Sequence, residues 1–116
     1  MDFPQAVQSA FRNYVNFQGR ASRSEYWYFI LFLLIGGIIV GIIDKASDSN
    51  TFRMLFDLAT FLPSLSVAVR RMHDINRTGW WVLLPLTIIG IIPYIYFLVI
   101  KGTEGENRFG ADPLAQ

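Results

Sequence analysis

The stretch YWYFILFLLIGGIIVGII, residues 26–43, runs for 18 positions without a charged side chain. An α-helix needs about 20 apolar residues to cross the hydrocarbon core of a bilayer, which is about 30 Å thick. The stretch therefore predicts a membrane-spanning helix over 26–43. A second uncharged stretch, Trp80–Ile100, has 21 residues and predicts another span over 80–100.

A third candidate span, Phe52–Val69, lies between these two and is less apolar. Its nine Leu, Phe and Val residues favour insertion by roughly 3–5 kcal/mol in total, whereas Asp57 would cost about 3 kcal/mol at the centre of a span. Asp57 follows Arg53 by four positions, so the two side chains can pair near the headgroups. We predict a span over 52–69, and the carboxylate also raises the hypothesis of ion or proton handling.

The composition agrees with a membrane protein and argues against several classes of partner and site. Of the 116 residues, 53% are hydrophobic, which leaves too little polar surface to cover a soluble domain of this size. The net charge of +1 supplies no basic field, so we expect no nucleic-acid partner. With no cysteine and a single histidine, we expect neither disulfides nor a metal site, and no cofactor.

The segment before the first span predicts a separate helix. Apolar residues recur at helical spacing through residues 1–18, and Pro4 suits a first helical turn. The helix is amphipathic, so it lies either on the bilayer surface or against the spans of the same chain. Gly19 can end it, and Ser22 with Glu25 forms a capping box that starts the next helix.

The remaining segments predict short connections and a tail. The polar stretch DKASDSNT, residues 44–51, is a tight turn that makes the first two spans antiparallel neighbours. Residues 101–116 are rich in glycine and acidic side chains, which indicates a solvated, irregular tail. The fold class is therefore an all-α membrane protein, with residues 1–116 forming one integral-membrane domain.

The third span allows two topologies because Pro85, Gly90 and Pro93 interrupt it. As a straight span it leaves six basic residues inside and four outside, whereas a re-entrant hairpin brings eight inside and leaves two outside. Length favours the straight span, since half of the segment rises only about 15 Å as a helix. We predict the straight, kinked span and keep the re-entrant hairpin as the alternative.

Small and aromatic residues mark the surfaces of the spans. Gly37 and Gly41 form a G-x-x-x-G face that allows close helix packing, either within the chain or in a homo-oligomer. Tryptophan favours the membrane–water interface, and we predict interfacial anchors at Trp27, Trp80 and Trp81.

The stretch RRMHDINRTGWW, residues 70–81, carries three arginines and the histidine between two apolar stretches. We interpret it as a cytoplasmic turn between the second and third spans, because arginines that flank a span orient it by the positive-inside rule. Orientation does not require the other polar residues of the stretch, which leaves room for a docking surface. The candidate binding face for anionic lipid or a protein partner comprises Arg20, Arg23, Glu25, Arg70, Arg71, His73, Asp74 and Arg77.

Three stretches together resemble a known family: FQGRASRSEYWYF at 17–29, PSLSVAVRRMHDINRTGWW at 63–81 and GENRFGADP at 105–113. They are similar to the small bacterial inner-membrane proteins known as domain of unknown function 805. The resemblance covers nearly the whole chain and implies a multi-pass protein of the bacterial inner membrane with about three spans. It implies no reaction, substrate or cofactor. Thr78 departs from the serine usual in the family before the Gly-Trp-Trp motif and retains its hydroxyl group.

Three classes of function follow from these features. The leading hypothesis is a non-enzymatic inner-membrane protein whose basic cytoplasmic face binds anionic lipid or a protein partner. The second is an oligomeric transport or channel component, suggested by Asp57 and the prolines. The third is a membrane enzyme that acts on lipid phosphate with His73 as acid or base, although the adjacent Asp74 points about 100° away on a helix and is poorly placed to orient it.

Overall fold

The computed structural model describes residues 2–86 and 89–113. The first residue of the predicted N-terminal helix, two residues of the predicted third span and the last three residues of the predicted tail lie outside the described residues. The described ranges contain helices and no β-strand, which confirms the all-α prediction for these residues. The elements are α1 (Phe3–Arg12), α2 (Arg23–Ser47), α3 (Thr51–Asp74), the 3-10 helix η1 (Gly79–Leu86) and α4 (Ile91–Val99).

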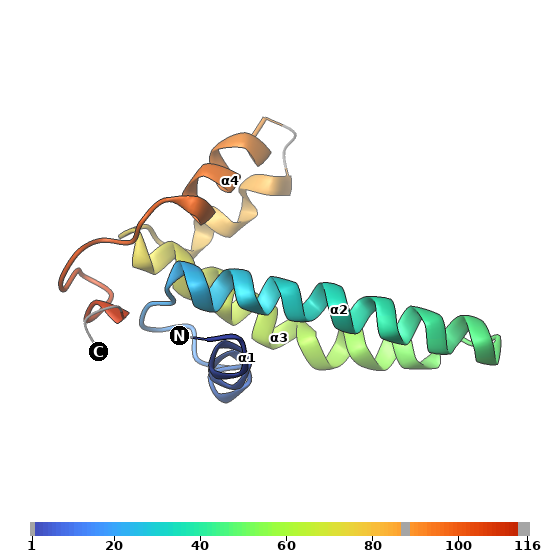
Figure 1. The fold of residues 1–116 in the computed structure, drawn as a ribbon. Helices are drawn as coiled ribbons and strands as arrows, with labels where there is room; N and C mark the ends of the chain where they lie inside the picture. Colours follow the sequence, from blue (N-terminus) through green and yellow to red (C-terminus); the bar gives the residue numbers. More distant parts are fainter. Residues whose placement is uncertain (1, 87–88, 114–116) are drawn as a thin grey trace.

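The two long helices, α2 and α3, lie side by side as an antiparallel hairpin (Figure 1). With 25 and 24 residues they rise about 37 and 36 Å, more than the thickness of a hydrocarbon core. Both are long and apolar enough to cross a membrane, and they contain the predicted spans 26–43 and 52–69. Their outward apolar side chains are exposed, among them Leu34, Ile38, Ile42, Met54, Leu58 and Phe61.

Glycines allow the two long helices to approach closely. Of Gly37 and Gly41, which the sequence predicted for this role, only Gly37 takes part. A methyl group on Gly36 would lie 2.7 Å from the ring of Phe56, and one on Gly37 would lie 3.0 Å from the Arg53 guanidinium. A methyl group on Gly41 would meet nothing within 4 Å. Gly37 therefore packs within the chain as one alternative expected, whereas the Gly41 surface is open.

Asp57 occupies the exposed side of α3 near its start. Its carboxylate lies 3.4 Å from Arg53 Nε, which confirms the predicted pair one helical turn apart. Both side chains are more than half exposed, so the pair contributes little to stability.

The turn between α2 and α3 is closed by a buried carboxylate that the sequence analysis did not single out. Asp44, in the last turns of α2, accepts hydrogen bonds from the backbone N–H groups of Phe52 at 3.1 Å and Arg53 at 2.8 Å. Asn50, in the N-cap position of α3, supplies no side-chain hydrogen bond. Asp44 thus satisfies N–H groups that would otherwise lack partners at the start of α3.

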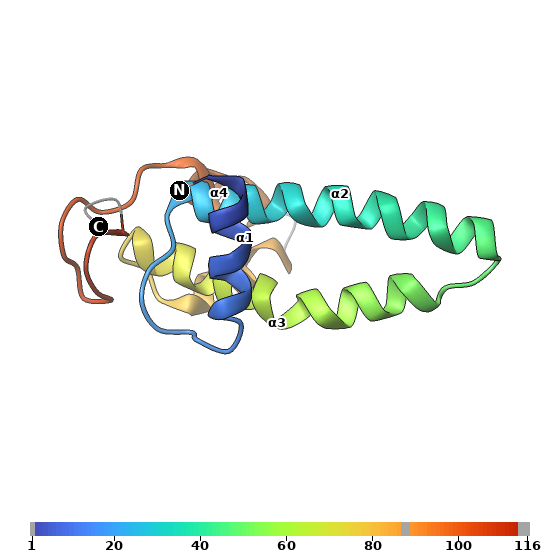
Figure 2. The same cartoon turned by 60° about the horizontal axis from the view of Figure 1, so that its bottom comes forward.

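The short helix α1 crosses the hairpin near the end where α2 begins (Figure 2). Ala6 and Ala10 are buried, and the ring of Phe11 packs edge-on against Phe29 and Phe32 of α2. Of the two placements expected for this helix, the structure has the one in which it docks on the chain's own helices.

The N-terminal helix is shorter than predicted: it ends at Arg12 rather than at residue 18. The Asn13 side chain bonds back to the Ser9 carbonyl, and the carbonyls of Asn13 and Asn16 accept from the Ser66 hydroxyl of α3. These contacts pull the chain out of the helical path before Gly19 is reached.

The prediction of a straight third span is wrong, because the segment folds back as in the re-entrant alternative (Figure 1). Gly79 opens η1 against Val69, near the end of α3. At the other end of the segment, the Trp27 indole at the start of α2 donates to the Leu98 carbonyl of α4 at 2.9 Å. The two ends of this segment therefore both lie at the end of the α2–α3 hairpin where α2 begins.

Proline and glycine account for the break. Pro85 lies inside η1 and lacks a backbone N–H group, Gly90 precedes α4, and Pro93 lies in its first turn. At nine residues α4 rises only about 14 Å and is too short to cross a bilayer. The length argument held that half of the segment is too short to cross the bilayer, but a segment that folds back does not have to cross it.

We predict that Asp44→Ala lowers the free energy of unfolding by about 1 kcal/mol, the usual value of a helix N-cap. Thermal unfolding of the detergent-solubilised protein measures the change. Lys45→Ala is the matched control, because Lys45 is the adjacent residue and its side chain is exposed. Equal melting temperatures for the two variants would refute the capping role.

Candidate functional site

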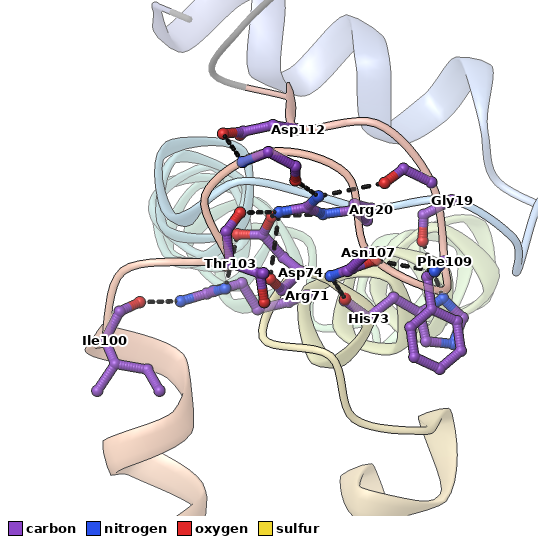
Figure 3. A network of polar contacts seen from close by, with 12 residues as sticks. Gly19, Arg20, Arg71, His73, Asp74, Ile100, Thr103, Asn107, Phe109 and Asp112 are labelled. Atoms are coloured by element: carbon purple, nitrogen blue, oxygen red, sulfur yellow. Dashed lines mark hydrogen bonds and ion pairs between the residues drawn. The ribbon is translucent and has the colours of Figure 1, made fainter.

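Charged side chains from three segments meet inside the protein at the end of the hairpin opposite the α2–α3 turn, and Figure 3 shows those around Asp74. We call this group the ion cluster: Arg20 of the α1–α2 loop, Glu25 of α2, and Arg70, Arg71 and Asp74 of α3. The last two turns of α3 continue past the apolar stretch, so most of these residues belong to a helix and not to the predicted turn. The turn itself is limited to residues 75–78.

One half of the ion cluster joins the first three helices. Arg70 Nη1 lies 2.6 Å from Glu25 Oε2, and both side chains are 4% exposed. The other carboxylate oxygen of Glu25 accepts from the Ser9 hydroxyl of α1. Arg70 Nε donates to the Ser66 hydroxyl at 3.2 Å, and that hydroxyl bonds to the loop that follows α1. The predicted role of Ser22 as the N-cap of α2 is confirmed, but Glu25 uses its carboxylate here instead of completing a capping box.

The other half is centred on Asp74, which is shared by two guanidinium groups. Arg20 Nη2 lies 3.0 Å from Asp74 Oδ1, and Arg71 Nη1 lies 2.9 Å from Oδ2. Arg20 also donates to the carbonyls of Thr103 and Gly105, the latter at 2.6 Å. These bonds attach the segment after α4 to the start of α2 and the end of α3.

Three guanidinium groups face two carboxylates, so the ion cluster carries one excess positive charge. Carbonyl oxygens offset this excess, since Arg71 donates to Ile100 at the end of α4. A cation is stabilised at the C-terminal end of a helix by the negative end of the helix dipole. Buried charges of this kind require partners, because the cost of removing them from water is several kcal/mol per ion.

The tail is irregular as predicted, but it is packed against the protein and not free in solvent. The Thr103 N–H donates to the Asp74 carbonyl at 2.7 Å, and the Asn107 amide donates to the His73 carbonyl at 3.0 Å. Gly102 is required at this contact, since a methyl group there would lie 2.0 Å from Asp74 Oδ2. Residues 101–110 thus cover the ion cluster.

His73 is held by two contacts rather than exposed for binding. Its Nδ1 lies 2.8 Å from the Gly19 carbonyl oxygen, which is within hydrogen-bonding distance. The ring stacks on Phe109 of the tail, with the two centroids 4.0 Å apart and the planes parallel. Gly19 has a φ of +87°, so this loop position favours glycine.

The exposed basic face expected from the sequence does not form as a single surface. Six of its eight residues are buried, namely Arg20, Glu25, Arg70, Arg71, His73 and Asp74. Arg77 is half-buried, with its guanidinium over the rings of Trp81 at 4.8 Å and Phe97 at 4.4 Å. Arg23 is the one member that is exposed.

The three predicted tryptophan anchors differ in exposure. Trp80 is 79% exposed beside an apolar groove of about 540 Å³ between the end of α3 and η1. Trp27 is 40% exposed, and Trp81 packs edge-on against Phe97 of α4. An outward tryptophan at this end suits an interfacial position.

Several residues that complete the site escaped the sequence analysis. Ser9, Ser66, Thr103, Asn107 and Phe109 are ordinary polar or aromatic residues that stand far apart in the sequence. Only the charge of Glu25 and Asp74, beside an excess of arginine, indicated that partners were needed. The described residues contain no group of three His, Cys, Asp or Glu side chains that could hold a metal ion.

Comparison with known proteins agrees with these features. The sequence profile of a family described as "Protein of unknown function (DUF805)" matches residues 14–111. The chain belongs to the DUF805 family. It is 44% identical to "Inner membrane protein YhaI" of Escherichia coli K12, covering 90% of this chain and 92% of the relative. It is 42% identical to "Inner membrane protein YhaH" of the same strain, covering 88% and 90%. No solved structure matches the chain significantly.

The DUF805 match confirms the resemblance seen in the sequence and includes every residue of the ion cluster. It also includes the tail as far as Ala111, so the part that covers the ion cluster belongs to the family region. Helix α1 precedes the matched residues.

We predict that Arg70→Met destabilises the protein by about 3–5 kcal/mol, because it leaves the buried Glu25 carboxylate without its cation. The double variant Glu25→Leu with Arg70→Met should recover much of this loss, since a buried ion pair can be replaced by apolar side chains at little cost. Thermal unfolding in detergent measures both.

Arg53→Met is the control for this test, because it breaks the exposed pair with Asp57 and should cost no more than about 1 kcal/mol. If Arg70→Met were as mild as Arg53→Met, the ion cluster would not be required for stability.

Proposed function

We propose that the chain is a non-enzymatic inner-membrane protein whose ion-cluster end faces the cytoplasm and interacts with anionic lipid. The observation that carries this proposal is the distribution of cations. Eight of the ten Lys and Arg residues belong to the segments at that end, and only Lys45 and Arg53 belong to the opposite end. The names of the two relatives, both inner membrane proteins, support the location.

The proposed topology has two full spans, α2 and α3, and a re-entrant hairpin made of η1 and α4. Both termini then lie in the cytoplasm, in agreement with the positive-inside rule. The exposed apolar side chains of α2 and α3 support their insertion, because an exposed surface of this extent is typical of contact with lipid.

The lipid interaction is assigned to cations outside the ion cluster. Arg12, Arg23, Lys101 and Arg108 are exposed at this end, whereas the arginines of the ion cluster are buried and paired with carboxylates of the chain. Each exposed cation near an anionic surface contributes about 1 kcal/mol to attraction. The ion cluster has a structural role in this proposal, since it holds together the helices and the tail that carry these cations.

The other hypotheses receive less support from the geometry. Asp57 is on the exposed side of α3 and pairs with Arg53, which does not resemble the lining of an ion pathway. His73 borders the groove beside Trp80 but is only 7% exposed, since it is held by Gly19 and Phe109, so little of its ring is open to a lipid phosphate. The open surface at Gly41 allows contact with a second copy but does not indicate one by itself.

Topology can be tested with single cysteines, because the chain has none of its own. We expect Ser49→Cys to react with a membrane-impermeant maleimide in intact cells. Glu106→Cys, at an exposed position of the tail, should react only after the membrane is opened. Labelling of Glu106→Cys in intact cells would place the tail outside and overturn the re-entrant topology.

Lipid preference can be tested by extracting the protein with its surrounding lipid and measuring the phospholipid composition. We expect anionic phospholipid to be enriched relative to the bulk membrane. The enrichment should disappear when Arg12, Arg23, Lys101 and Arg108 are all replaced by Gln, but not in the far-end control Lys45→Gln. A wild-type protein without enrichment, or one accompanied instead by a recurrent protein partner, would contradict the lipid assignment.

A further inference from the structure

A groove of about 520 Å³ lies on the outer side of the ion-cluster end, between the first turns of α2 and the last turn of α4. Five of its six lining residues belong to α2, and Arg23, Trp27 and Leu31 follow one stripe of that helix, because residues four apart in a helix share a face. The groove is lined by Arg23, Ser24, Trp27, Tyr28, Leu31 and Val99.

The polar end of the groove holds a cation without an acidic partner. Arg23 is exposed, and none of the ion pairs between described residues includes it. Its guanidinium donates one hydrogen bond, to the Val99 carbonyl at 3.2 Å, which holds it at the mouth of the groove and leaves its other N–H groups available. Lys101 is close enough to Arg23 for the two charges to interact, and it is paired with Glu104 at 2.8 Å.

The apolar end is formed by the side chains of Trp27, Tyr28 and Leu31. The indole N–H of Trp27 is bonded to the Leu98 carbonyl, which fixes the ring as a wall of the groove. The ring of Tyr28 is held edge-on to Phe3, with centroids 6.1 Å apart. Leu31 continues the apolar surface farther along α2 and is 42% exposed.

The order of these groups along α2 matches the order of groups in a phospholipid. From Arg23 to Leu31 the helix rises about 12 Å, and the lining changes over this length from charged to aromatic to aliphatic. A headgroup phosphate, the glycerol region and the upper part of an acyl chain succeed one another in the same sequence. A free anion would use only Arg23 and leave the apolar part uncovered.

We propose that this groove binds one anionic phospholipid, with its phosphate at Arg23 and an acyl chain along Trp27, Tyr28 and Leu31. The inference rests on the proposed function, because it assigns part of the anionic-lipid preference to a single site. The Arg23 guanidinium can make a bidentate contact with the phosphate of an anionic headgroup. A zwitterionic headgroup also carries an ammonium group, which would be repelled by Arg23 and Lys101.

Native mass spectrometry of the full chain in detergent, titrated with phosphatidylglycerol or phosphatidylcholine, measures the first binding event. We expect one phosphatidylglycerol to bind before others and more tightly than phosphatidylcholine. Arg23→Gln should weaken this first event about tenfold, the effect of losing a charge-assisted hydrogen bond. Leu31→Trp, which fills the apolar end without changing charge, should weaken it as well.

Lys45→Gln is the matched control, because it removes one positive charge from an exposed position outside the groove and outside the four cations to which the lipid interaction is assigned. It should leave the first event unchanged. Equal losses in Lys45→Gln and Arg23→Gln, or displacement of the lipid by inorganic phosphate, would overturn the single-lipid site. The bulk enrichment of anionic lipid would then still stand, whereas absence of any preference in the wild type would overturn the proposed function itself.

Discussion

The pairing of Asp74 with two arginines is the constraint on which the ion-cluster end of this protein depends. A buried carboxylate requires cations, and Arg20 and Arg71 bring with them the α1–α2 loop and the backbone that follows α4. Glu25 and Arg70 do the same for α1 and the first turn of α2. These ionic contacts join segments that also share a buried apolar cluster, which includes Ala10 of α1, Phe29 of α2, Val67 of α3 and Phe97 of α4.

The two ends of the molecule are held together by different interactions. Along α2 and α3, exposed apolar side chains need no internal partner if lipid surrounds them, so glycine contacts and one capping carboxylate suffice to align the pair. At the other end the backbone is irregular, and its polar groups need partners that lipid cannot supply. The guanidinium groups of Arg20 and Arg71 provide these partners by donating to carbonyls of residues 100–110.

The sequence was sufficient to predict the two long helices, because hydropathy and capping are local signals that neighbouring residues decide. It was not sufficient for the third segment, where an apolar length suited to a span conflicted with two prolines and a glycine. The positive-inside count favoured the fold-back, but length was given more weight. The burial of Arg70 and Arg71 could not be predicted either, since arginines after a span look alike whether they face headgroups or turn inward. Their orientation depends on Glu25, Asp74 and a tail remote in sequence.

The tail contact also determines when the structure can be completed. Arg20 bonds to the Gly105 carbonyl, 85 positions later in the sequence, so the loop before α2 acquires this partner only after residue 105 has been synthesised. Until then the ion cluster lacks the segment that covers it, and its charges remain open to their surroundings. A chain interrupted before residue 105 therefore leaves the Arg20 side of the ion cluster uncovered.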